Sequence, residues 1–182
     1  MGCRAQAERD GPHLHRPAEE RLPAGATQTV LDQRRQALTT AARAAIAQGD
    51  DAAAEKHLRA SIEAAKQVPQ AALGEQLRSA DELIWLSYVL ARQGRSAEAR
   101  GLIGPVLAIQ RSLRQQVGND DQFQRRALVL ALAAAAAAEP TSAKALLDEA
   151  QAQHARLTAE MRSLNSTVFI AQRMAEVGRS RP

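Results

Sequence analysis

A pattern of small and apolar residues occurs three times along this chain, at offsets of 45 and 44 residues. In each copy the first-helix positions follow in steps of three, one and three, which place them on one face of a helix. After a turn, the second-helix positions begin with a small residue and follow in steps of four and three. The first-helix positions are Leu38, Ala41, Ala42 and Ala45, then Leu83, Leu86, Ser87 and Leu90, then Ala127, Leu130, Ala131 and Ala134; the second-helix positions are Ala54, Leu58 and Ser61, then Ala99, Ile103 and Val106, then Ala143, Leu147 and Ala150. Three consecutive helix–turn–helix units are therefore the main constraint on the fold.

The composition also favours an all-α protein. The 182 residues include forty Ala and twenty Leu but only four aromatic residues. A β-sandwich or a layered α/β sheet would need more aromatic and β-branched side chains than this chain provides. Alanine has the highest intrinsic helix propensity, and its small side chain lets neighbouring helices approach closely.

Turn-forming residues predict where the helices end, with Gly49, Pro69 and Gly94 as stop signals. Helices are expected over residues 29–48, 51–68, 79–93, 96–117 and 121–138, with a sixth that opens at residues 140–142 and carries an apolar stripe to residue 168, and a terminal helix over residues 159–177. Pro105 predicts a bend inside the fourth helix. Residues 1–26 are expected to be a disordered tail, residues 27–178 the helical-repeat domain and residues 179–182 a frayed end.

The repeated unit resembles the tetratricopeptide repeat (TPR), which places large and small residues at these relative positions of a helix pair. The resemblance covers about residues 30–158, although the period of 45 and 44 residues is longer than the usual one and Leu or Ala fills most aromatic positions. It implies a right-handed α-solenoid of about three antiparallel hairpins with a C-terminal capping helix. Small residues at the helix crossings, such as Ala42 facing Ala54, would permit close approach.

The resemblance further implies recognition of a peptide or protein segment on the concave face, formed mainly by the first helices. The matching positions are Gln36, Thr39 and Arg43 in the first copy, Asp81, Ile84, Tyr88 and Arg92 in the second, and Arg125, Leu128 and Leu132 in the third. A groove with an aromatic anchor and forked guanidinium groups would suit a peptide that carries carboxylates. The alternative is that the arginines are merely solvated and that Trp85 and Tyr88 pack between hairpins.

The sequence contains none of the common catalytic or cofactor-binding motifs, so we expect a non-catalytic protein with no cofactor and no metal. His154 lies on an apolar helix stripe, where a packed histidine is more common than a catalytic one. The single Cys3 excludes an intramolecular disulfide. No apolar run is long enough to span a membrane, and a cytoplasmic location is the expectation.

The formal charge of +4 comes from arginines spread along the whole chain. Because no block of like charge stands out, nucleic-acid binding is the weaker alternative to protein binding. A purely structural or self-associating module of a larger regulatory protein, including a homo-oligomer, is the other alternative. Three repeats are near the minimum that can bury a continuous core.

Overall fold

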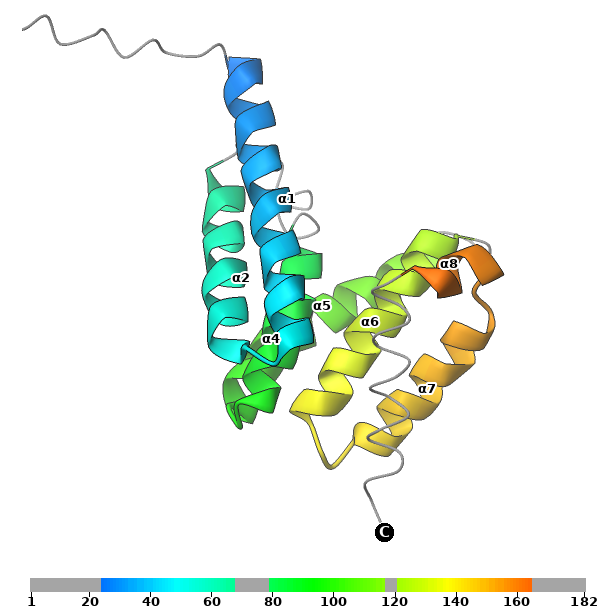
Figure 1. Ribbon diagram of the computed structural model, residues 1–182. Coiled ribbons are helices and arrows are strands. Elements are labelled where there is room, and N and C mark those ends of the chain that lie inside the picture. The colour runs from blue at the N-terminus through cyan, green and yellow to red at the C-terminus, as the bar shows by residue number, and fades with distance from the viewer. Residues whose placement is uncertain (1–23, 68–78, 117–120, 165–182) are drawn as a thin grey trace, which may run out of the picture.

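The computed structural model describes residues 24–67, 79–116 and 121–164, and in these ranges every regular element is a helix (Figure 1). The elements are α1 (Ala24–Gln48), α2 (Asp51–Lys66), α4 (Ala80–Arg92), α5 (Ser96–Gln116), α6 (Gln122–Ala138), α7 (Ala143–Ala155) and α8 (Ala159–Ser163). The prediction of an all-α fold is confirmed for the described residues. None of the helices in those ranges has the length and apolar character needed to cross a membrane.

The two predicted glycine turns have the backbone conformation that the sequence indicates. Gly49 and Gly94 have φ values of +79° and +78°, which side-chain-bearing residues rarely adopt. At the end of α1, the Asp50 N–H donates to the Ala45 carbonyl at 2.9 Å. At the end of α4, the Arg95 N–H donates to the Leu90 carbonyl at 2.9 Å. These bonds are typical of the Schellman ending of a helix, so both hairpins turn in the same way.

Aspartate side chains begin two of the helices. Asp50 accepts a hydrogen bond from the Ala53 N–H at 2.9 Å, and Asp121 accepts one from the Gln124 N–H at 3.0 Å. Each carboxylate satisfies a backbone donor that the helix itself leaves unpaired. The turn between α6 and α7 lacks glycine, and the residue that follows the end of α6 is Glu139, which has φ −128°.

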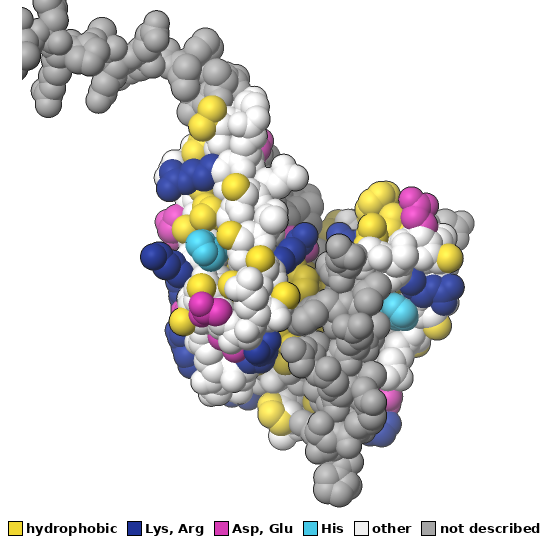
Figure 2. Space-filling model, viewed as in Figure 1, with side chains coloured by type: hydrophobic (Ala, Val, Ile, Leu, Met, Phe, Trp, Pro, Cys, Tyr) yellow, Lys and Arg dark blue, Asp and Glu magenta, His cyan; other side chains and the backbone are white. Residues whose placement is uncertain are grey.

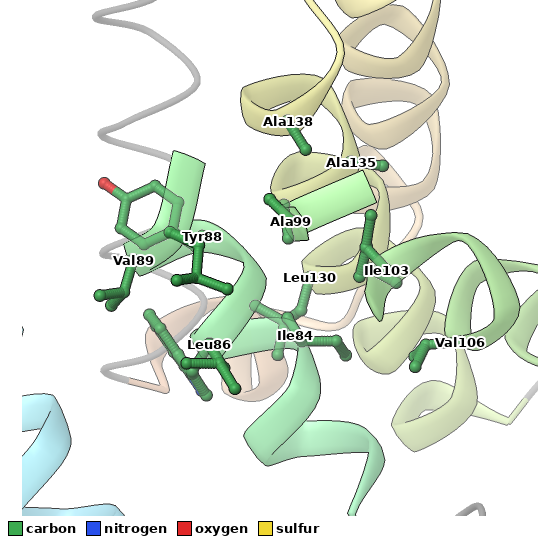
Figure 3. Packing of buried hydrophobic residues seen from close by; sticks show 14 of the residues in the cluster. Ile84, Leu86, Tyr88, Val89, Ala99, Ile103, Val106, Leu130, Ala135 and Ala138 are labelled. Atoms are coloured by element: carbon green, nitrogen blue, oxygen red, sulfur yellow. The ribbon is translucent and has the colours of Figure 1, made fainter. Parts of the chain in front are cut away.

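From α1 to α7, each described helix packs on the next described one, and α6 also contacts α4 and α8. The α1–α2 and α6–α7 pairs run antiparallel (Figure 1). The core lies between these helices, and Figure 3 shows side chains of α4, α5 and α6 converging in it, with Ala99 of α5 near Ala135 and Ala138 of α6. The small residues predicted at the crossings are all fully buried, namely Ala42, Ser87, Ala131, Ala54, Ala99 and Ala143.

Enlarging one of these small side chains should destabilise the fold. Ala99→Leu adds three carbon atoms to a position with no exposed area, so we expect the free energy of unfolding to fall by about 1–3 kcal/mol in urea titrations. Ala97→Leu, at an exposed position of the same helix, is the matched control and should change it by less than about 0.5 kcal/mol. Equal effects of the two substitutions would contradict close packing at the crossing.

The structure corrects the predicted start of the first helix and the predicted extent of the sixth. Helix α1 begins at Ala24, five residues before the expected start and inside the expected tail. The apolar stripe over residues 143–168 does not form one helix, because α7 ends at Ala155 and a new helix, α8, begins after Thr158, which caps it. Leu157 and Met161 nevertheless stay buried with Val129, which explains why the apolar pattern continues across the break.

Helix α5 runs through Pro105 without a break, as expected. Residues 1–23 of the predicted tail, residues 165–177 of the predicted terminal helix and the frayed residues 179–182 lie outside the described residues. The described part of that terminal helix is α8, which begins at the expected Ala159 but ends at Ser163.

Candidate functional site

A polar pocket of about 450 Å³ lies between α1 and the first turn of α4. This volume falls within the range of about 300–1,000 Å³ that is usual for ligand sites. All of its lining residues are charged or carry a hydroxyl or amide group: Asp32, Arg35, Gln36, Thr39, Thr40, Arg43, Asp81 and Glu82. Every lining residue can therefore offer a polar group to the pocket.

Helical periodicity brings the α1 side chains to the pocket. Gln36, Thr39, Thr40 and Arg43 follow one another in steps of three, one and three, so they share one face of the helix. The Thr39 hydroxyl donates to the Arg35 carbonyl at 3.0 Å, and the Thr40 hydroxyl donates to the Gln36 carbonyl at 2.8 Å. Both hydroxyl protons are thus used inside the helix, while the hydroxyl oxygens remain acceptors.

A buried ion pair forms the inner wall of the pocket. Arg35 Nη2 donates to Glu82 Oε1 at 2.8 Å, and the side chains are only 15% and 5% exposed. The Ser61 hydroxyl of α2 donates to the same carboxylate oxygen at 3.1 Å and lies 3.3 Å from the Thr39 hydroxyl oxygen. One network thereby joins α1, α2 and α4.

A second, more exposed ion pair forms the outer wall. Arg43 Nη2 lies 2.6 Å from Asp81 Oδ2, and the Arg43 guanidinium is 5.7 Å from the centre of the Trp85 ring. Further along α4, Arg92 pairs with Asp51 at 3.1 Å and lies 5.8 Å from the centre of the Tyr88 ring. Both arginines therefore combine a carboxylate and an aromatic contact within the chain.

Four of the ten predicted site residues line the pocket together, namely Gln36, Thr39, Arg43 and Asp81. Arg92 lies outside the pocket. The other five were expected on an open concave surface, but the structure buries them: Ile84, Tyr88, Arg125, Leu128 and Leu132 are 1%, 7%, 2%, 2% and 0% exposed.

The burial of these five residues has a physical cause in the packing of α4 and α6. Helix α6 contacts α4, α5, α7 and α8, so residues from most of its circumference are covered. Arg125 of α6 donates to Gln153 Oε1 of α7 at 3.2 Å. These five side chains are therefore not available on an open surface in this structure.

Four lining residues were missed from the sequence: Asp32, Arg35, Thr40 and Glu82. Asp32 and Arg35 continue the helical spacing of Gln36 and Thr39, so the same periodicity predicts that they lie on this face of α1. The sequence does not mark Glu82 as a site residue, because an acidic residue in the first turn of a helix is already explained by the helix dipole.

A cluster of four charges on α2 and α5 provides a contrast with the pocket. Arg59 and Arg95 both bind Glu55 and Glu98, at 2.5 to 2.9 Å. Burial raises the pKa of Glu55, but hydrogen bonds from Arg95 and Arg59 outweigh it and lower that pKa overall. Hydrogen bonds from Arg59 and Arg95 likewise lower the pKa of Glu98. This cluster is a structural link between two helices.

His154 is partly buried on α7, and this burial, together with the nearby Arg162, lowers its pKa. Among the described residues, no group of three His, Cys, Asp or Glu side chains is arranged to hold a metal ion. No family model, curated protein or solved structure matches this chain.

Proposed function

We propose that this protein is a non-catalytic interaction scaffold whose TPR-like helix pairs form a right-handed solenoid, and that it binds an extended segment of a partner protein at the pocket between α1 and α4. The observation that carries the proposal is the pocket itself. It lies between the first helices of two successive repeats, where the resemblance predicts recognition, and four predicted residues line it.

The packing order of the helices also supports a solenoid. Contacts join α1 to α2, α2 to α4, α4 to α5, α5 to α6 and α6 to α7, and the first helices of the second and third copies, α4 and α6, touch each other. Nearest-neighbour packing of this kind is what stacked helical hairpins require.

The distribution of charge favours a protein partner over a nucleic acid. Six arginines, at positions 35, 43, 59, 92, 95 and 111, form ion pairs with acidic side chains of the chain itself. Figure 2 shows basic and acidic side chains interspersed over the α1–α2 part of the visible face. Such a surface lacks the continuous positive stripe that phosphate binding uses.

The proposal can be tested by panning a displayed library of random peptides against the full chain. Enriched peptides should bind in calorimetry, and Gln36→Trp, which places a bulky ring in the pocket, should weaken binding by about tenfold, the equivalent of ~1.4 kcal/mol. Gln151→Trp makes the same change at an exposed position of α7 and should leave binding unaltered.

Three outcomes would contradict the proposal. Enriched peptides that bind equally well to Gln36→Trp would place recognition elsewhere. A chain that enriches no peptide but forms oligomers in sedimentation would favour the self-associating module instead, and a chain that binds oligonucleotides with a steep salt dependence would favour the nucleic-acid alternative.

A further inference from the structure

The pocket carries a net negative charge in a chain that is positive overall. It is lined by three carboxylates, Asp32, Asp81 and Glu82, and two guanidinium groups, Arg35 and Arg43. Its formal charge is therefore −1, against +4 for the whole chain. This local reversal favours a positively charged ligand group at the pocket.

The hydrogen bonds in the pocket point to the same conclusion. Both arginines already donate to carboxylates of the chain, Arg35 to Glu82 and Arg43 to Asp81, and both threonine hydroxyls donate to backbone carbonyls. Oδ1 of Asp81, by contrast, receives no hydrogen bond from any described residue, and the Asp81 side chain is 38% exposed. The Asp81 carboxylate thus offers an acceptor at the pocket, while each guanidinium already faces a carboxylate of the chain itself.

A partner carboxylate, which the sequence led us to expect, would have to compete with Asp81 for Arg43 at 2.6 Å. An ammonium or guanidinium group could bind at Asp81 Oδ1 without displacing Arg43 from Oδ2, so that two cations would share the Asp81 carboxylate. Resting on the proposed function, we propose that the pocket binds a cationic side chain, lysine or arginine, of the partner segment.

The inference can be tested with three pentapeptides that carry Lys, norleucine or Glu at the centre of a glycine sequence with blocked ends. Each is titrated into the ¹⁵N-labelled full chain and followed by NMR. The lysine peptide should shift the backbone amides of residues 32–43 and 81–82, and the other two should shift them much less. Asp81→Asn should weaken lysine-peptide binding by about fivefold, because it removes one charge and leaves Arg43 unpaired.

Asp148→Asn is the matched control, since it removes one exposed negative charge from α7, away from the pocket. It should leave the titration unchanged. Stronger binding of the glutamate peptide, unaltered lysine binding in Asp81→Asn, or no shift at the pocket with the lysine peptide would each overturn the inference.

The peptide-library experiment distinguishes failure of the cationic-ligand inference from failure of the proposed scaffold function. Enriched peptides that lose binding in Gln36→Trp but contain no required Lys or Arg would overturn the cationic ligand and leave the scaffold proposal intact. If every enriched peptide loses binding when its Lys or Arg is replaced by norleucine, the result supports both the scaffold proposal and the cationic ligand.

Discussion

Replacing Glu82 with alanine should lower the free energy of unfolding by about 3–5 kcal/mol, because it leaves the largely buried guanidinium of Arg35 without its main partner. The Ser61 hydroxyl, which is fully buried, loses its carboxylate acceptor at the same time. Urea unfolding followed by the fluorescence of the single tryptophan measures the change. A loss of this size is a large part of the total stability of a typical domain, which is about 5–15 kcal/mol.

Two further variants show whether the loss comes from the buried Arg35 charge, which would keep only the more distant Asp32 carboxylate, at 3.7 Å, as an ion-pair partner among the described residues. Glu63→Ala removes a carboxylate from an exposed ion pair of α2, where the side chain is 65% exposed, and should cost no more than about 1 kcal/mol. The double variant Arg35→Met with Glu82→Leu replaces the pair by apolar groups and should recover most of the stability. A cost below about 1 kcal/mol for Glu82→Ala alone would mean that the pair is effectively solvated.

Several helix ends follow from the sequence because their signals are local. Gly49 and Gly94 stop their helices through the conformation of one residue, and Asp50 and Asp121 cap theirs through a bond to a backbone N–H three positions later. The apolar pattern does not mark the break at residues 156–158, because Leu157 within it and Met161 after it are both buried and keep the apolar spacing intact, although the expected terminal helix begins where α8 does, at Ala159. Periodicity records which face is buried but does not show that the helix is continuous.

The candidate site could be predicted only in part. The α1 residues Gln36, Thr39 and Arg43 share a face that helical spacing defines, so their proximity follows from the sequence. Whether a face is open depends on which other helices cover it, and Leu128 and Leu132 look like groove residues until α6 is seen among its four helical neighbours. The pairing of Arg35 with Glu82 spans 47 positions and depends on how α1 and α4 pack.

Trp85→Ala should also lower the free energy of unfolding by about 3–5 kcal/mol, because the indole is 2% exposed in the main core cluster. The substitution removes an edge-to-face contact with Tyr88, with the ring centres 6.4 Å apart, and the surface on which the Arg43 guanidinium lies. Circular dichroism in urea measures the loss. Phe123→Ala, at a ring that is 69% exposed, is the aromatic control and should change stability by less than about 0.5 kcal/mol.

The same variant decides between the two roles that the sequence left open for the aromatic residues. A tryptophan that packs between helix pairs should destabilise the fold when removed, and in the intact chain its fluorescence should be blue-shifted and unaffected by bound peptide. A tryptophan that serves as an exposed anchor would cost little stability, and its emission would change on binding. Because Trp85 lies beneath Arg43 at the outer wall of the pocket, we expect its contribution to recognition to be indirect, through the position of Arg43 relative to Asp81.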